Sequence, residues 1–237
     1  MDLSTLTFAD FVALSGFLGA WLGYSLLVDH GPLSSRTLSA QMDGQRREWV
    51  LLMQARDVRI ADVSILSGLQ NGTAFFATAS MLAIGACLAL IGSSDSVSIA
   101  IQDILVDSGG GASPDLFEAK VIGLVLIFVY AFFKFGWSYR LINYASILCG
   151  ALPLPSQSDT AATALAVDRT SQFLQLGGSN FNRGQRAFSF GIAYLCWLAG
   201  PWFLLAASAV VLLVLVHRQF WSRPARAFRG GSAADGR

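Results

Sequence analysis

Charged residues are scarce in this chain. Asp, Glu, Lys and Arg together supply 13% of its 237 residues, whereas soluble globular domains carry about 25%. The chain also has only two histidines and three cysteines. Neither histidine has the spacing from a cysteine or from the other histidine that a zinc site needs, and no C-x-x-C pair occurs. These scarcities argue against a soluble domain and against a metal centre.

Sequence motifs of catalysis and of nucleotide binding are missing as well. The chain has no nucleophile elbow and no H-E-x-x-H sequence. The glycine run at 109–111 lacks the spacing and the lysine of a phosphate-binding loop. A net charge of +1 gives no reason to expect a nucleic-acid partner. We therefore expect a protein that is not an enzyme, needs no cofactor and binds no nucleic acid.

Long apolar runs are what the chain has in quantity. Hydrophobic residues make up 54% of it and the mean hydropathy is +0.55. Apolar runs of about 18 residues or more are typical of transmembrane helices, because lipid offers the backbone no hydrogen-bond partner. The sequence therefore predicts an all-α integral membrane protein, with a single membrane domain over 1–220. Its four transmembrane helices are expected at 8–28, 71–92, 121–140 and 187–216.

Two further helices are expected outside the hydrocarbon. Apolar and charged residues interleave over 43–69 and again over 159–176, which is typical of amphipathic helices at a membrane surface or on the cytoplasmic side. Gly177 and Gly178 are expected to end the second of these helices. The basic tail at 221–237 is expected to be disordered.

The arginines conflict with a simple four-span topology. The first and third loops are rich in arginine and the second is acidic, so the first and third are expected in the cytoplasm. Four spans would then leave the tail, which holds five arginines after His217, on the opposite side. Gly200–Pro201 divides the last apolar run. One long kinked helix is favoured there, and a re-entrant hairpin that returns the tail to the cytoplasm is the alternative.

Small residues on the first predicted span mark a candidate contact face. Gly16, Gly19 and Gly23 are spaced three or four residues apart, and this spacing lets two membrane helices approach closely. The pattern predicts helix packing or a dimer contact, although glycine is common in membrane helices in any case.

Two fixed charges stand out in the third predicted span. Lys134 and Arg140 lie in YAFFKFGWSYRLINY, where a charge is costly unless it is paired, buried in the bundle or near the interface. They are expected to anchor the cytoplasmic end of the helix within an aromatic belt. An ion pair of Lys134 with Asp62 or Glu48 is an alternative. A third interpretation is one site for an anion or a lipid headgroup, made by Lys134, Arg140, Arg183, Arg186, Arg46 and Arg47.

Four stretches give the chain a family resemblance. They are REWV from Arg47, SGLQNGTAFFAT from Ser67, GLVLIFVYAFFKFGWSYRLINY from Gly123 and FNRGQRAFSFGIAYL from Phe181. Together they resemble the domain of unknown function 599 family, small membrane proteins of proteobacteria and plants. The resemblance implies a multi-span membrane protein, and it implies no activity, substrate or catalytic residue.

The function expected from these features is structural. We expect a non-catalytic scaffold, assembly factor or accessory subunit in a bacterial inner membrane. Its expected partners are membrane lipids, together with further copies of itself or a larger membrane complex. A small oligomeric transporter or channel with a basic site in the third span is the alternative, and a lipid-modifying enzyme is the least favoured.

Overall fold

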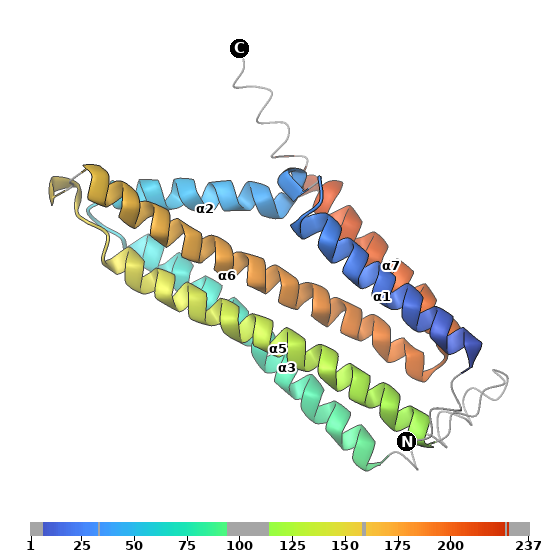
Figure 1. Cartoon of the computed structure of the whole chain (residues 1–237). Coiled ribbons are helices and arrows are strands. Elements are labelled where there is room, and N and C mark those ends of the chain that lie inside the picture. Colours follow the sequence, from blue (N-terminus) through green and yellow to red (C-terminus); the bar gives the residue numbers. More distant parts are fainter. Residues whose placement is uncertain (1–6, 33, 94–113, 158–159, 226, 228–237) are drawn as a thin grey trace.

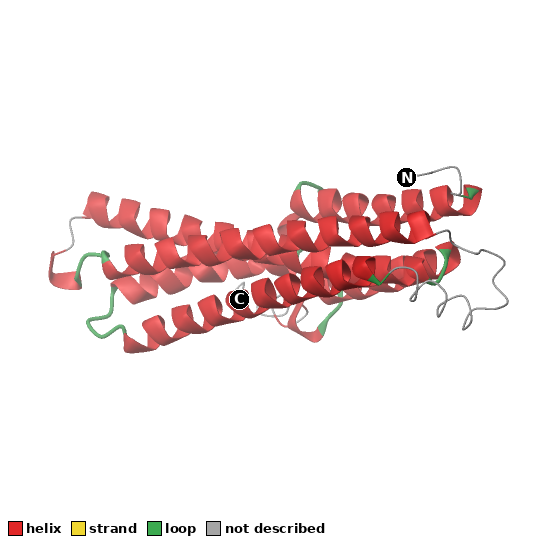
Figure 2. Cartoon of the chain, turned by 90° about the horizontal axis from the view of Figure 1, so that it is seen from below, coloured by secondary structure: helices red, strands yellow, loops and turns green. Residues whose placement is uncertain are grey.

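The computed structural model of the chain describes residues 7–32, 34–93, 114–157, 160–225 and 227. Within these ranges all regular secondary structure is helical (Figures 1 and 2). The acidic loop expected between the second and third spans falls mostly at 94–113, outside the described residues. Most of the expected disordered tail at 221–237 also lies outside them, at 226 and 228–237, but residues 223–225 are helical.

Six α-helices and three short 3-10 turns make up the described fold. The turns are Ser34–Arg36, Pro155–Gln157 and Cys196–Leu198. The α-helices are α1 (Phe8–Asp29), α2 (Leu38–Gln54), α3 (Ile60–Gly92), α5 (Pro114–Gly150), α6 (Thr160–Leu195) and α7 (Pro201–Phe220).

Four of the helices, α1, α3, α5 and α7, are long and apolar enough to cross a membrane. The segments are Phe8–Asp29, Ile60–Gly92, Asp115–Gly150 and Pro201–Ala225. The prediction of an all-α membrane protein with four transmembrane helices is therefore confirmed. Two of the helices, α3 and α5, are much longer than their predicted spans.

The helices pack in two groups. Helices α3, α5 and α6 lie side by side as three long rods, while α1 and α7 pair with each other at one end of α6 (Figure 1). Helix α2 packs on the other end of α6 (Figure 1). The main core lies where α1 and α7 meet α5 and α6, and it includes Phe17, Leu124, Phe190, Tyr194 and Leu204.

The expected end of a helix at Gly177–Gly178 is wrong, because α6 continues unbroken to Leu195. A Cβ atom on Gly177 would lie 2.9 Å from Ile142 of α5, and one on Gly178 would lie 2.6 Å from the guanidinium of Arg46. These glycines therefore serve close packing on two sides of the helix. Tertiary contacts outweigh their low helix propensity.

The predicted amphipathic helix at 43–69 is two helices. Helix α2 ends at Gln54 and α3 begins at Ile60, so the chain turns over 55–59. The second part of the predicted helix is continuous with the predicted span at 71–92, and together they form the 33 residues of α3.

The favoured single kinked helix over 187–216 is also wrong, because the chain leaves one helix and reverses direction within this run, whereas a re-entrant course through the membrane stays a prediction. Helix α6 ends at Leu195, and Gly200 has a φ of 146°, which only glycine adopts readily. Pro201 then starts α7, the position where its fixed φ suits a helix. Arg218 near the end of α7 donates to Oε1 of Gln185 on α6 at 3.0 Å. The two helices therefore run antiparallel.

Candidate functional site

The last residue of α1 is the centre of a charged cluster. The carboxylate of Asp29 accepts a hydrogen bond from Nε of Arg183 at 3.0 Å. It also accepts two from one terminal nitrogen of Arg186, at 2.7 and 2.9 Å. Both arginines come from α6, three residues apart on one helical face. Two guanidinium groups thus share one carboxylate, which leaves an excess of one positive charge.

A cavity of about 230 Å³ opens beside this cluster. Helix α1 contributes Trp21, Ser25 and Asp29 to its lining, and His30 follows directly after the helix. The remaining walls come from Tyr130 of α5 and from Arg183 and Arg186 of α6. The cavity therefore combines aromatic surface with two cations.

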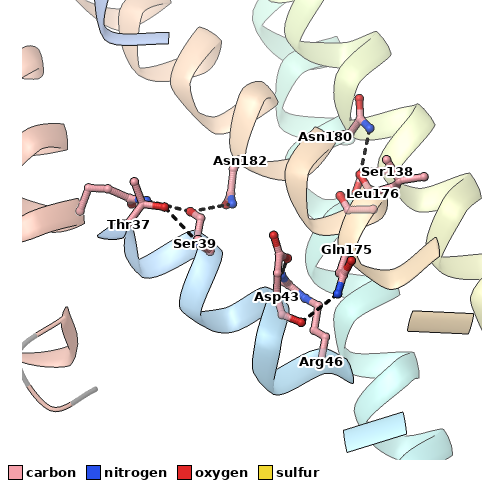
Figure 3. A network of polar contacts seen from close by, with 12 residues as sticks. Thr37, Ser39, Asp43, Arg46, Ser138, Gln175, Leu176, Asn180 and Asn182 are labelled. Atoms are coloured by element: carbon pink, nitrogen blue, oxygen red, sulfur yellow. Dashed lines mark hydrogen bonds and ion pairs between the residues drawn. The ribbon is translucent and has the colours of Figure 1, made fainter. Parts of the chain in front are cut away.

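Polar contacts fix the helices around the cavity. Ser39 at the start of α2 accepts hydrogen bonds from Asn182 of α6 at 3.1 Å and from Gln219 of α7 at 3.0 Å (Figure 3 shows the former). The hydroxyl of Tyr24 on α1 donates to the carbonyl of Leu215 on α7 at 3.2 Å. Four helices are thus held together at the level of Asp29.

The other end of α1 carries a second buried charge cluster. Nε1 of Trp197 donates to Oδ1 of Asp10 at 2.7 Å, and Nζ of Lys120 lies 3.6 Å from the same oxygen. Lys120 also donates to the carbonyl of Trp197 at 3.3 Å. All three side chains are at least nine-tenths buried. Asp10 and Asp29 therefore tie both ends of α1 to the segment that contains α6 and the turn after it.

The structure divides the predicted anion site. Arg183 and Arg186 lie together in the cavity wall. Lys134 does not line the cavity, but its Nζ lies 5.4 Å from the ring centroid of Tyr130, which does. Arg140 points elsewhere, because its Nε donates to the hydroxyl of Tyr144 one turn further along α5, at 2.9 Å.

Arg46 and Arg47 lie outside the cavity, on α2. Arg46 pairs with Asp43 (Figure 3), and its guanidinium lies over Gly178. The pKa of the Asp43 carboxyl is raised, because burial has a larger effect than the opposing charge of Arg46. Nε of Arg47 lies 3.6 Å from Asp168 of α6. Both arginines therefore hold α2 on α6 and are not brought to Arg183.

The alternative ion pair of Lys134 with Asp62 or Glu48 is wrong. Asp62 instead accepts hydrogen bonds from Nε1 of Trp49 at 2.8 Å and from Arg56 at 2.9 Å. Glu48 accepts one from Gln45 at 3.2 Å. Among the described residues, neither carboxylate has an ion pair with Lys134.

The three glycines of the predicted contact face of α1 have different surroundings. A Cβ atom on Gly16 would lie 2.7 Å from Leu205, so this residue packs against α7. Cβ atoms on Gly19 or Gly23 would have nothing within 4 Å. Gly16 thus packs within the chain, and a contact of Gly19 and Gly23 with a second chain stays a prediction.

Sequence reasoning missed the two carboxylates that organise α1. Asp10 and Asp29 are the only charged residues of that helix, and an ionisable residue in or beside a membrane span is a recognisable signal of pairing. Their charged partners lie 110 residues or more further along the chain. That distance is why sequence spacing did not reveal them.

Comparison with known proteins gives one match. Residues 12–224 match the family described as "Protein of unknown function, DUF599". No curated protein matches the chain, and no solved structure does. Since the matched region covers most of the chain, including every described helix that lines the cavity, the protein belongs to the DUF599 family of proteins of unknown function.

Proposed function

We propose that the protein is a non-catalytic membrane scaffold or accessory subunit that presents one half of its helical bundle to a partner protein. The observation that carries this proposal is the length of α3, α5 and α6. They contain 33, 37 and 36 residues, so each is about 50 Å long or more. A bilayer core is only about 30 Å thick.

The surplus length lies at one end of the molecule. Helices α1 and α7, with 22 and 20 residues, match the thickness of a bilayer and lie at the opposite end of the long rods (Figure 1). We call the half of the molecule away from α1 and α7 the far half. It is rich in charged residues, which favours a location in water over one in hydrocarbon. Its charged residues include Asp43, Arg46, Arg47, Glu48, Arg56, Asp57, Arg59, Asp62, Asp168 and Arg169.

The arginines support a cytoplasmic location for this half. Cytoplasmic segments of membrane proteins carry an excess of Lys and Arg. Because α7 runs back along α6, its last turn and Arg218 lie on the same side as Arg183 and Arg186. The hairpin therefore removes the conflict that four simple spans create for the basic tail. This orientation requires the end of α6 to lie within the membrane beside the four candidate spans, and a bacterial inner membrane fits it.

The end of the far half carries exposed apolar side chains. The end of α2, the start of α3 and the connection between α5 and α6 meet there (Figure 1). Large apolar side chains in water mark sites of protein interaction. We name as the tip patch six side chains with exposed fractions from 43% to 78%: Leu51, Leu52, Val58, Ile60, Val63 and Leu154.

Charge placed on the tip patch is expected to release the partner. Val58→Asp combined with Ile60→Asp adds two charges, and an acidic residue at the start of α3 suits the helix dipole, so the fold should survive. The matched control is Ser64→Asp combined with Ser67→Asp, which adds the same charge to exposed polar positions of α3. Blue-native electrophoresis of mildly solubilised native membranes, with mass spectrometry of the bands, measures the assembly.

The wild type and the serine control are expected to migrate in a complex with a second protein, and the tip variant as the free chain. A wild-type chain that migrates alone would contradict the proposal. So would a complex that the tip variant leaves intact. A band that contains only copies of this chain would mean that the chain binds itself and not a second protein.

A further inference from the structure

The cavity beside Asp29 has the composition of a binding site for an amphipathic anion. Arg183 and Arg186 line it, and the single carboxylate of Asp29 neutralises only one of them. Arg183 binds Asp29 through Nε. None of the hydrogen bonds among the described residues uses its two terminal nitrogens, and its side chain is 35% exposed. These N–H groups are available for the fork-shaped contact that guanidinium makes with phosphate oxygens.

The position of the cavity favours a lipid over a soluble anion. Asp29 is the last residue of α1, a helix of bilayer length, so the charged wall lies at the headgroup level. Trp21 lies two turns deeper along the same helix, and Tyr130 of α5 lines the cavity with it. The two rings are in edge contact, with centroids 6.1 Å apart. A free phosphate ion has no apolar atoms to pack against this aromatic wall, whereas a lipid has apolar atoms next to its phosphate.

The size of the cavity and a neighbouring cation limit which part of a lipid can bind there. About 230 Å³ is smaller than pockets for drug-sized molecules, which are about 300–1,000 Å³. It suits a headgroup and excludes acyl chains. Tyr130 is 43% exposed, so the cavity has an open side there, and Lys134 lies over the same ring. Basic pockets of this kind between membrane helices hold acidic headgroups.

We propose that this cavity binds the phosphate of an anionic glycerophospholipid. Arg183 and Arg186 hold the phosphate oxygens, Lys134 adds a positive charge at the mouth, and the acyl chains lie outside along α1 and α5. Assignment of the lipid to the cytoplasmic leaflet rests on the orientation proposed above. The binding itself does not depend on the partner protein.

The test is a lipid titration of the purified full chain, followed by native mass spectrometry. Phosphatidylglycerol is compared with phosphatidylcholine, and inorganic phosphate is added as a competitor. Arg183→Gln removes one cation and keeps the pair of Arg186 with Asp29. The matched control is Arg169→Gln, the same charge change at an exposed position of α6 away from the cavity. Lys134→Gln is a second variant, which removes the positive charge at the mouth of the cavity and leaves the Asp29 cluster unchanged.

Arg183→Gln is expected to weaken phosphatidylglycerol binding about tenfold or more, since hydrogen bonds to charged groups have effects of this size. Lys134→Gln should weaken it by a smaller factor. Arg169→Gln and the tip patch variant should bind like the wild type, which separates failure of this site from failure of the docking proposal. The proposal is overturned if phosphatidylcholine binds equally well, if inorganic phosphate competes at the same concentration as the lipid, or if Arg169→Gln has the same effect as Arg183→Gln.

Discussion

Asp29→Asn is expected to destabilise the protein by about 3 kcal/mol, the lower end of the range for breaking a buried ion pair. The substitution leaves Arg183 and Arg186 facing each other without a counter-charge. Arg186 is the more costly of the two, because its side chain is only 8% exposed. The lower end of the range applies because Asp29 itself is 19% exposed. The midpoint of thermal unfolding in detergent measures the loss as a fall of several degrees.

Asp168→Asn is the matched control for this prediction. Asp168 also pairs with an arginine, but the two side chains are 48% and 56% exposed and their atoms lie 3.6 Å apart. Exposed pairs of this kind contribute about 0–1 kcal/mol, so the control should unfold close to the wild type. Phosphatidylglycerol should recover part of the loss in Asp29→Asn, because a bound phosphate supplies the missing negative charge. Equal midpoints for the two variants would contradict the role given to Asp29.

Gly184→Ala is expected to destabilise the protein by about 1–3 kcal/mol, the usual cost of overpacking a core. The added Cβ would lie 2.7 Å from the ring of Phe135, which is fully buried and stacked on Phe76. The ring therefore has little freedom to move. The same measurement of thermal unfolding applies.

Gly184 belongs to a series on α6. Gly177, Gly184 and Gly191 recur every seven residues, and added Cβ atoms would lie within 3 Å of Ile142, Phe135 and Phe128 respectively. A repeat of seven residues keeps one helix face toward its neighbour along the whole length of the pair. We call these three glycines the glycine seam. They allow α5 and α6 to pack closely from the membrane into the far half.

Gly44→Ala is the control for the glycine seam. Gly44 lies in the exposed part of α2, and an added Cβ would have nothing within 4 Å. Alanine at such a position is expected to be neutral or to stabilise by about 0.4–1 kcal/mol, because it restricts the unfolded chain. If Gly184→Ala behaved like Gly44→Ala, close packing between α5 and α6 would not explain the glycine series.

The sequence predicted the membrane class well, because apolar composition over a span length is a local property. It failed where distant contacts decide the structure. Gly177 and Gly178 resemble a helix stop until Ile142 and Arg46 are seen to occupy the space that side chains would need. Gly200–Pro201 marked a break in the last apolar run, but a kinked span and a reversal share that local signal, and only the contact of α7 with α6 separates them.

For the same reason, the sequence predicted only part of the candidate site. Arg183 and Arg186 were expected to act together, and their spacing on one helix is sufficient for that. Arg140 was expected to join them, yet it lies against Tyr144 of its own helix. Asp29, which organises the cluster, comes from the end of α1 and carries no local signal of its partners.

The return of α7 to the arginine-rich side is tested most directly by labelling of single cysteines with a membrane-impermeant maleimide. The native cysteines Cys87, Cys149 and Cys196 are replaced with alanine, and Ser64→Cys, Ser93→Cys and Arg223→Cys are introduced one at a time at exposed positions. Intact cells and inverted vesicles give the two sides of the membrane. Ser64→Cys and Arg223→Cys are predicted to react from the cytoplasmic side and Ser93→Cys from the opposite side. Reaction of Arg223→Cys on the same side as Ser93→Cys would contradict the hairpin between α6 and α7, and with it the proposed orientation of the bundle.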